Sequence, residues 1–244
     1  MRLDGKNVLV TGANRGLGRQ LVRLLRAAGC AKVYEGVRRI EAPDSTDAVA
    51  LDITKPDDIT AAVVRCVDIE ILINNAGVAG FTPLLGTPTT DNARNEMETN
   101  YFGTLAMCRA FAPVLKRNGG GAIVNVLSVV SWFNAPMQGS YCASKAAEWS
   151  LTKAVRFELR GQHTFVAGVH AGYIDTDMTA GLTAEKSSPA DIARQILIGI
   201  ENDEEEILAD PRARALRTSL LGDYGPIDAS MQKAWDDLQR SKGG

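Results

Sequence analysis

The chain has 244 residues, of which 45% are hydrophobic and 23% charged, and its formal net charge is -2. This balance is ordinary for a globular protein and excludes a disordered or fibrous class. So small a net charge gives no electrostatic reason to expect a nucleic acid or an anionic membrane as a partner, and we expect a small-molecule ligand instead.

The first predicted element leads into a glycine-rich turn. An aliphatic run at residues 8–10 predicts a buried strand, Gly12, Gly16 and Gly18 follow it, and a helical pattern covers residues 19–28. Glycine lets the backbone approach a ligand closely, and a helix start offers unpaired N–H groups to a phosphate. The turn therefore predicts a site for a nucleotide pyrophosphate, although a Gly-x3-Gly-x-Gly spacing by itself also suits a purely structural turn.

The second predicted strand, residues 32–37, ends at the pair Arg38-Arg39. In a doubly wound α/β fold this strand end faces the adenosine ribose, where a carboxylate favours NAD and an arginine favours the 2′-phosphate of NADP. We therefore interpret Arg38 as a phosphate-binding residue, with Arg15 of the glycine turn as its partner. The alternative is that both are solvated loop cations.

Two further strands are predicted, at residues 48–51 and 69–73. The first ends at Asp52 and precedes a helix that Thr54 is expected to cap, with Pro56 in its first turn. The second breaks into Asn-Asn-Ala-Gly at residues 74–77, which suits a backbone that passes close to a ligand.

A long helix is predicted at residues 91–117, with the polar Asn100 in its middle. Asn100 is either a satisfied amide or a residue that distorts the helix and holds a water near the chemistry. The strand predicted at residues 122–127 is uninterrupted enough to be central and parallel, and Ser128 stands at its carboxyl end.

Tyr141 and Lys145 stand one turn apart at the start of the next predicted helix, which continues to residue 160. A free tyrosine has a pKa of about 10, and a neighbouring ammonium favours the phenolate and lowers that pKa towards the operating pH. The pair can therefore perform acid-base chemistry, while Ser128 holds the substrate oxygen. Taken alone, Tyr-x-x-x-Lys also occurs by chance on exposed helices.

Taken in order, these motifs resemble the classical short-chain dehydrogenase/reductase family. That family shows T-G-x-x-x-G-x-G, N-N-A-G, a mid-helix asparagine, and a serine upstream of Y-x-x-x-K. The matching positions here are residues 11–18, residues 74–77, Asn100, Ser128, Tyr141 and Lys145. The resemblance implies one Rossmann-like, doubly wound α/β domain over residues 1–244, with a mostly parallel central sheet and helices on both faces.

The resemblance also implies a role for each position. Tyr141 would be the general acid or base, Lys145 would bind the nicotinamide ribose and lower the tyrosine pKa, and Ser128 would orient the substrate. Asn100 would hold a water in a proton relay. The residues implied to bind the cofactor are Gly12, Asn14, Arg15, Gly16, Leu17, Gly18, Arg38, Asp52, Ile53, Asn74, Ala76, Gly77, Tyr141, Lys145, Gly172, Ile174 and Thr176.

The chain departs from the family pattern after its sixth predicted strand, where Ala171 replaces the usual proline. Without the ring that fixes φ, the turn beside the nicotinamide is expected to be looser. His170, just before it, is interpreted as a polar residue that satisfies local backbone groups rather than as a catalytic base.

The last part of the chain is expected to face the substrate. Residues 178–188 are small and polar, as in a mobile lid, and Ser188 with Pro189 predicts a helix start. A short strand is predicted at residues 207–209. Two amphipathic helices, around residues 212–220 and 229–238, are predicted within a variable C-terminal segment, residues 211–244.

The cysteines and the hydropathy pattern bear on the environment of the protein. The four cysteines are far apart and form no C-x-x-C pair, which predicts buried reduced thiols and no metal site. The sequence shows no apolar signal region and no run of about 18 apolar residues, so we expect a cytoplasmic protein without a membrane span. Family analogy suggests a homodimer or homotetramer through the two long helices.

Together, the residues and the resemblance predict an NADP(H)-dependent oxidoreductase, with NAD(H) left open, that interconverts a carbonyl compound and an alcohol through Tyr141. Two alternatives stay open: an NADP-binding sensor or scaffold without turnover, and an epimerase or dehydratase of the same family. The substrate depends on the lid, the loop at residues 78–90 and the C-terminal segment, whose residue types do not define a pocket shape.

Overall fold

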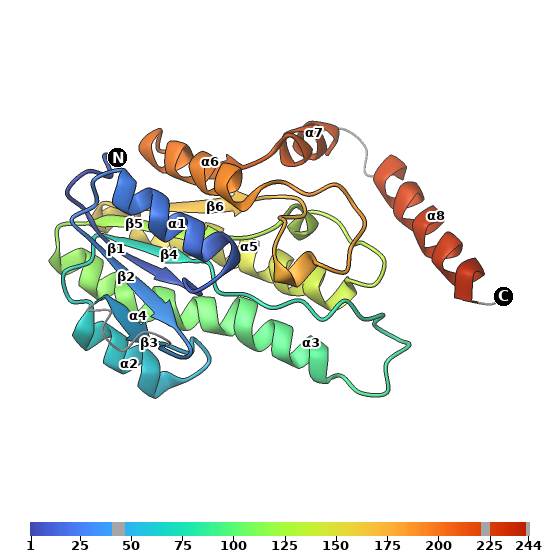
Figure 1. Ribbon diagram of the computed structural model, residues 1–244, viewed down its shortest axis with the longest axis horizontal. Coiled ribbons are helices and arrows are strands. Elements are labelled where there is room, and N and C mark those ends of the chain that lie inside the picture. The colour runs from blue at the N-terminus through green and yellow to red at the C-terminus, as the bar shows by residue number, and fades with distance from the viewer. Residues whose placement is uncertain (41–46, 221–224, 243–244) are drawn as a thin grey trace.

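The computed structural model describes residues 1–40, 47–220 and 225–242, and its centre is a parallel sheet in the order β3-β2-β1-β4-β5-β6-β7 (Figure 1). Each pair of neighbouring strands is parallel. This confirms the doubly wound α/β fold predicted from the sequence. The strands are β1 (Asn7–Thr11), β2 (Lys32–Val37), β3 (Ala48–Ala50), β4 (Ile71–Asn74), β5 (Gly121–Val126), β6 (Thr164–His170) and β7 (Glu206–Leu208).

Helices connect the strands and flank the sheet, and two more follow the last strand, the second of which extends away from the sheet in Figure 1. They are α1 (Gly16–Ala27), α2 (Pro56–Arg65), α3 (Asp91–Glu96), α4 (Thr104–Arg117), α5 (Gly139–Leu159), α6 (Pro189–Glu201), α7 (Pro211–Ser219) and α8 (Gly225–Lys242). A π-helical segment, Met97–Gly103, joins α3 to α4, so the helix predicted at residues 91–117 is one continuous run with a wider turn in its middle. In the described part of the chain, no helix combines the length and apolar character that crossing a bilayer demands.

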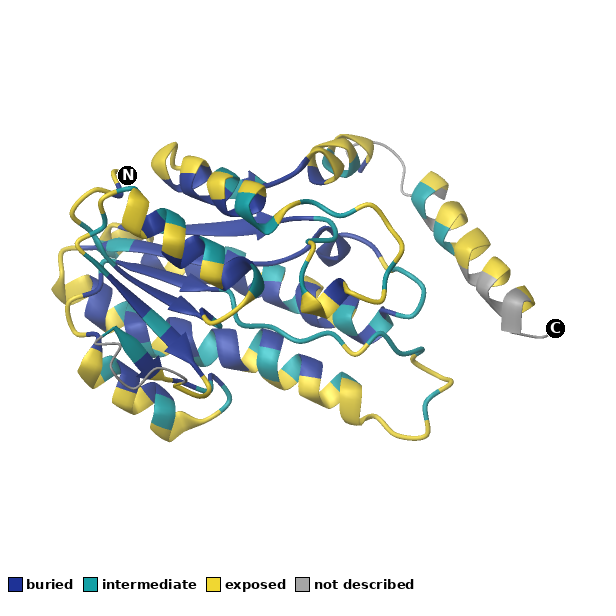
Figure 2. Cartoon of the chain, viewed as in Figure 1, coloured by how far each residue is buried: buried dark blue, intermediate teal, exposed yellow. Residues whose placement is uncertain are grey.

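Side chains of the strands alternate between two hydrophobic layers. Val8 and Val10 of β1 belong to the layer that α1 and α6 complete, whereas Leu9 belongs to the layer completed by α2, α4 and α5. This alternation follows from the pleat of a strand, and it explains why strands covered on both faces read as continuous apolar runs. Figure 2 shows the strands buried between helices whose outer faces are exposed.

The order of the sheet places a crevice next to β1. The chain moves outward from β1 through β2 to β3 and then returns to the other side of β1 with β4. In open parallel sheets, ligands bind outside the carboxyl ends of the strands at such a reversal. The glycine turn after β1 and the loop that begins at Asn75 after β4 therefore lie next to each other at this crevice.

The two predicted helix caps have different outcomes. The Thr54 cap is wrong: α2 follows Lys55, and Thr54 instead donates its hydroxyl to Asp52 Oδ1 at 2.7 Å. A short side chain two residues from an aspartate closes an Asx-type turn as readily as it caps a helix. Ser188 does cap α6, because its Oγ accepts the N–H of Asp191 at 3.3 Å.

The stability of this arrangement can be tested at Phe111 of α4, a fully buried side chain of the layer between α4 and the sheet. Phe111→Ala should lower the free energy of unfolding by about 3–5 kcal/mol, because it removes buried apolar surface and leaves a cavity. Urea unfolding followed by circular dichroism measures this. Val64→Ala, at an exposed position of α2, is the control and should change stability by less than about 0.5 kcal/mol.

Candidate active site

A cleft of about 880 Å³ opens at the carboxyl ends of the strands. It extends from the glycine turn after β1 to the start of α5 and the turn after β6. Asn74 and Asn100 are the two predicted site residues that do not line it. The predicted residues that do line it are Gly12, Asn14, Arg15, Gly16, Leu17, Gly18, Arg38, Asp52, Ile53, Ala76, Gly77, Ser128, Tyr141, Lys145, Gly172, Ile174 and Thr176.

The glycine turn has no room for side chains at its critical positions. Gly12 and Gly16 adopt positive φ angles of 66° and 50°, which disfavour other residues. A Cβ on Gly18 would lie 2.1 Å from the carbonyl oxygen of Gly12, a backbone atom that cannot rotate away. The spacing Gly-x3-Gly-x-Gly is therefore a steric requirement of this turn.

The turn is fastened to the loop after β4 by Thr11 and Asn75. The Thr11 hydroxyl accepts the N–H groups of Asn75 and Ala76, both at 3.0 Å. The Asn75 amide donates in return to the carbonyl oxygens of Thr11 and Gly12. Neither Thr11 nor Asn75 was among the predicted site residues, although both stand inside the motifs that carried the prediction.

The first turn of α1 faces the cleft without a capping side chain. Arg15 occupies the N-cap position, and no side-chain cap and no acidic residue in the first turn is found there among the described residues. Gly16, Leu17 and Gly18 line the cleft. Free N–H groups at a helix start bind phosphate oxygens, so the turn and α1 fit a dinucleotide pyrophosphate.

Two arginines line the cleft. Arg15 and Arg38 both line it, and Arg15 Nη1 lies 3.4 Å from Asp177 Oδ2, across from the glycine turn. Both partners of this ion pair are largely exposed, so the pair is weak and open to competition from another anion. The arrangement fits a further phosphate in addition to the pyrophosphate. This further group is the 2′-phosphate that was predicted from Arg38.

Asp52, predicted to bind the cofactor, accepts hydrogen bonds from its own loop. Its Oδ1 accepts both the N–H and the hydroxyl of Thr54. Burial raises the pKa of this carboxyl, but the hydrogen bonds from Thr54 and the charges of Lys55 and Arg38 outweigh burial and hold the pKa below its ordinary value. Asp52 therefore presents a carboxylate at the rim of the cleft.

Asn74 points into the protein, and its neighbour Asn75 reaches the cleft. The Asn74 amide donates to Asn125 Oδ1 at 2.9 Å across the pair of strands β4 and β5. Asn125 in turn donates to the hydroxyl of Thr152 in α5. The alternation of strand side chains was the signal that distinguishes the two asparagines.

Asn100 lies in the π-helical segment and is completely buried. Its Oδ1 accepts the N–H of Val78 at 2.9 Å, while its Nδ2 donates to the carbonyl oxygen of Val78 and to Ser144 Oγ. Of the two alternatives predicted for Asn100, the structure shows the satisfied buried amide and also a distortion of the helix. Both N–H donors of the amide are used, so the relay role stays a prediction.

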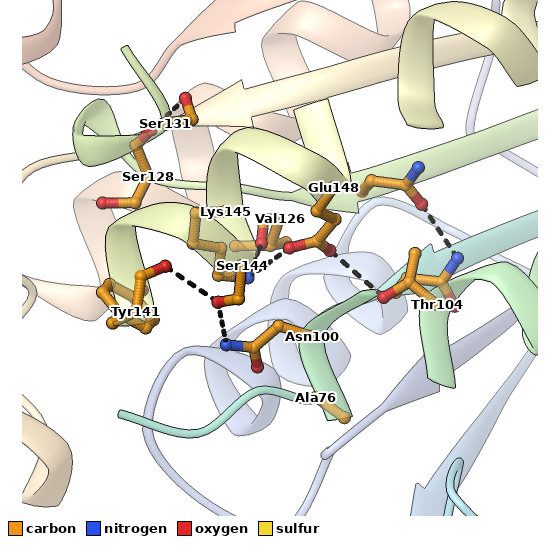
Figure 3. Close-up of polar contacts among 12 residues, drawn as sticks. Ala76, Asn100, Thr104, Val126, Ser128, Ser131, Tyr141, Ser144, Lys145 and Glu148 are labelled. Carbon is orange, nitrogen blue, oxygen red and sulfur yellow. Dashed lines mark hydrogen bonds and ion pairs between the residues drawn. The ribbon is translucent and has the colours of Figure 1, made fainter. Parts of the chain in front are cut away.

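Tyr141 and Lys145 begin α5 on the face that borders the cleft (Figure 3). Lys145 Nζ lies 6.0 Å from the centre of the Tyr141 ring. Ser144 donates its hydroxyl to the Tyr141 carbonyl oxygen at 2.8 Å and accepts from Asn100. Figure 3 shows this chain of contacts, which fixes the first turn of α5 to the π-helical segment.

The pKa of Tyr141 differs from the sequence-based expectation. Burial raises it, and this outweighs the lowering by the Lys145 ammonium and by a hydrogen bond with Ser128, so the pKa lies above its ordinary value. The Glu148 carboxylate adds to the increase. A lowered value was expected because the sequence shows the lysine one turn away, but it shows neither the partial burial of the ring nor the position of the second charge.

Lys145 is buried against Glu148, a residue that the motifs did not single out. Its Nζ donates to Glu148 Oε2 at 2.6 Å and to the carbonyl oxygen of Val126 at 2.9 Å. Thr104 of α4 donates to the other oxygen of Glu148 (Figure 3). A glutamate three residues after the lysine on a helix was the available signal.

Ser128 borders the cleft at the end of β5, and a buried polar cluster holds its backbone. The Ser128 carbonyl oxygen accepts from Ser131 Oγ at 2.6 Å and lies 3.3 Å from His170 Nδ1. His170 Nε2 lies 2.7 Å from Glu206 Oε2, and the ring stacks on Trp132. His170 has no exposed surface, which agrees with its interpretation as a partner of local backbone groups.

The turn after β6 is held by an aspartate that replaces the constraint of a proline ring. The N–H of Gly172 donates to Asp210 Oδ2 at 2.7 Å, and Ala171 accepts from the N–H of Val129 at 3.0 Å. Asp210 is 3% exposed and also caps α7 through Ala213. A partner distant in sequence therefore supplies a restraint on this turn, and its expected looseness stays a prediction.

The predicted lid and C-terminal segment contribute the outer wall of the cleft. Met178, in a short 3-10 turn (Asp177–Thr179), lines it, as do Arg212 of α7 and Met231 of α8. Residues 221–224 and 243–244 of the predicted C-terminal segment lie outside the described residues. The four cysteines are free, and all but Cys30 are buried.

Comparison with known proteins assigns these features to one family. The family described as short chain dehydrogenase matches residues 6–187. The 3-oxoacyl-(acyl-carrier-protein) reductase FabG of Vibrio cholerae is 33% identical, covering 87% of this chain and 93% of its own. A dehydrogenase/reductase SDR family member 7B of Bos taurus is 29% identical, covering 91% of this chain and 80% of its own.

A similar solved structure is a short chain dehydrogenase from Burkholderia cenocepacia in complex with NADP. It is 38% identical, superposes with a TM-score of 0.89, and the match covers 95% of this chain and 99% of that chain. The similarity therefore includes the C-terminal part of the chain, which lies beyond the family match.

The steric requirement of the glycine turn can be tested directly. Gly18→Ala should weaken binding of NADPH or NADH about tenfold or more, because the added Cβ forces the Gly12 carbonyl out of place. Isothermal titration calorimetry measures the affinity. Gly161→Ala is the matched control, since a Cβ there meets nothing within 4 Å. Equal affinities of the two variants would contradict this prediction.

Proposed function

Because the chain belongs to the short-chain dehydrogenase/reductase family of oxidoreductases, we propose that it interconverts a carbonyl compound and an alcohol with NADP(H). The observation that supports this most directly is the position of Ser128, Tyr141 and Lys145 on the same cleft as the glycine turn. One end of the cleft suits the phosphates of a dinucleotide, and the other offers a proton donor and a polar anchor. This combination favours an enzyme over a sensor that only binds the cofactor.

In the proposed reaction the chain supplies the proton and the orientation. A bound nicotinamide supplies or accepts the hydride. In the direction of reduction, Tyr141 donates its phenolic proton to the substrate oxygen as the carbonyl carbon gains two electrons, and the phenolate then recovers a proton from solvent. Ser128 donates a hydrogen bond to the same oxygen, and Lys145 stabilises the phenolate.

The cofactor is proposed to be held along the inner wall of the cleft. The glycine turn and the start of α1 would bind the pyrophosphate, and Lys145 would donate to the nicotinamide ribose. Gly172, Ile174 and Thr176 would contact the carboxamide. Asp52 would contact the adenine, while Asn74 would act through the loop that follows it.

The preference for NADP(H) is proposed on the basis of Arg15 and Arg38. Both line the cleft, Arg15 as the N-cap residue of α1 and Arg38 directly after β2, and the planar guanidinium group binds phosphate oxygens in pairs. The similar structure from Burkholderia cenocepacia was solved with NADP. The exposed pair of Arg15 and Asp177 would open when a 2′-phosphate offers Arg15 a doubly charged partner.

Further proposals concern the lid, the assembly and the location of the protein. We propose that residues 178–188 close over the substrate and that the chain forms a homodimer or homotetramer in the cytoplasm. Phe102 and Phe157 stand 50% and 72% exposed on the two long helices, and exposed aromatic side chains on neighbouring helices suit a contact between subunits.

Replacing the proton donor tests the proposed chemistry. Tyr141→Phe should lower kcat by about 10²–10⁴-fold and leave cofactor affinity near that of the wild type, because the phenolic hydroxyl is lost and the ring remains. Loss of NADPH absorbance with a panel of aldehydes and ketones measures turnover. Retained turnover in Tyr141→Phe would refute the proposed acid.

The cofactor preference has its own test. The wild type should use NADPH with a higher kcat/KM than NADH, and Arg38→Ala should reduce that ratio about tenfold, since each good phosphate contact contributes about 1.5–3 kcal/mol. Arg39→Ala, at the adjacent residue that does not line the cleft, is the control. A clear preference of the wild type for NADH would contradict the roles of Arg15 and Arg38.

A further inference from the structure

The buried pair of Lys145 and Glu148 stands behind the cleft on α5. The two residues are three positions apart, the Nζ to Oε2 distance is 2.6 Å, and their side chains are 5% and 1% exposed. We propose that Glu148 is a positioning residue whose carboxylate fixes the Lys145 ammonium and offsets its positive charge, which lies 6.0 Å from the centre of the Tyr141 ring, and so sets the site for proton donation to a carbonyl. This inference rests on the proposed role of Tyr141.

Glu148 limits where the ammonium can be. Of the three N–H donors of Lys145, one is directed to the Val126 carbonyl oxygen and one to Glu148. Lys145 also lines the cleft, which leaves its third donor for a ligand there. A lysine side chain has a flexible four-carbon stem. The hydrogen bond to the Glu148 carboxylate therefore fixes the position of Nζ, so that its remaining N–H donor lies at one place.

Glu148 accepts a hydrogen bond at each carboxylate oxygen, which favours its ionised form, although burial outweighs these bonds and raises the pKa of Glu148 above its ordinary value. Its Oε1 accepts from the Thr104 hydroxyl at 3.1 Å and its Oε2 accepts from Lys145. Both partners are donors, which a carboxylate satisfies and a protonated acid does not. A buried ion pair is often no more stabilising than apolar residues of the same volume. Its presence behind the proton donor therefore points to a role in the chemistry.

The charges that act on Tyr141 come from several packed elements. Burial raises the pKa of Tyr141, Lys145 lowers it, and Glu148 raises it again. Ser128, after β5, lowers it through a hydrogen bond, and the Cys142 thiol on α5 raises it. Burial lowers the pKa of Lys145, but Glu148 and Tyr141 outweigh burial and hold it above its ordinary value.

Two other ionisable groups face this region from α3 and α4. Burial raises the pKa of the Cys108 thiol of α4 to about 12, so that it is neutral near pH 7. Glu96 of α3 accepts from the N–H of Gly80 and acts on Cys142. Glu148 is thus the carboxylate that contacts Lys145 directly, and Glu96 provides a buried carboxylate for comparison.

The direction of the pH effect follows from the two forms of the tyrosine. Carbonyl reduction needs the neutral phenol, so activity is present below the pKa of Tyr141 and falls as the pH rises through it. Alcohol oxidation needs the phenolate, so its rate is low below the pKa of Tyr141 and rises as the pH increases through it. The pH profiles of the two directions therefore have opposite limbs. Because Glu148 raises this pKa, removal of its charge should move both limbs to lower pH.

The test is a titration of Tyr141 in the full-length protein by ultraviolet difference spectroscopy, with Tyr141→Phe as the reference for the remaining tyrosines. The pKa of Tyr141 is expected to fall in Glu148→Gln and to stay near the wild-type value in Glu148→Asp, which keeps the charge. Glu96→Gln is the matched control for a buried carboxylate that does not contact Lys145. The oxidation limb of kcat should move to lower pH in Glu148→Gln in parallel.

An unchanged or higher pKa of Tyr141 in a folded Glu148→Gln protein would overturn the proposal, and so would an equal fall in Glu96→Gln. Glu148→Met removes the charge without leaving an amide unpaired, and it replaces the glutamine variant if circular dichroism shows that variant to be unfolded. The titration needs no substrate, so it separates this proposal from the proposed function. Turnover retained by Tyr141→Phe would refute the proposed function, while the effect of Glu148 on the pKa of Tyr141 would still be decided by the titration.

Discussion

The close approach of two strand ends is the constraint on which the site depends. The ends of β1 and β4 are joined by Thr11 and Asn75, whose side chains bind the opposite backbone. At this distance no side chain fits at Gly18, where a Cβ would meet both the Gly12 carbonyl and the Asn75 amide. The glycines are thus needed for the protein to join its own strands as well as to admit a phosphate. The spacing of the glycines therefore meets two requirements, the contact between the two strand ends and the space for a phosphate.

A second set of contacts fixes the groups proposed for acid-base chemistry. Asn74, Asn125 and Thr152 form a buried chain of hydrogen bonds from β4 through β5 to α5. Near the start of α5, Ser144 accepts a hydrogen bond from Asn100. The next residue, Lys145, donates to the Glu148 carboxylate. Buried polar groups are costly unless paired, so the shift of one element would leave several unpaired at once. Such a network specifies one position for α5 relative to the sheet.

The parts that sequence patterns predicted are those encoded by neighbouring residues. The aliphatic strands, the glycine turn, the cap at Ser188 and the interruption at Asn100 all follow from local periodicity or from the conformation of single residue types. The misplaced cap at Thr54 shows the limit of such signals, since the same residue types serve an Asx turn. Local patterns also could not decide which of Asn74 and Asn75 faces the cleft until the last residue of the strand was known.

The remaining features depend on partners brought together by folding. The pKa of Tyr141 depends on the burial of its side chain and on Glu148 as well as on Lys145. The motif Tyr-x-x-x-Lys predicts neither how far the tyrosine is buried nor where the glutamate side chain points. The restraint on Gly172 comes from Asp210, 38 positions along the chain. Asp210 also caps α7 and lies 3.4 Å from the hydroxyl of Ser187, at the end of the proposed lid. The turn after β6, the end of the proposed lid and α7 therefore share one buried aspartate, so displacement of any one of them would disturb a carboxylate that also holds the other two.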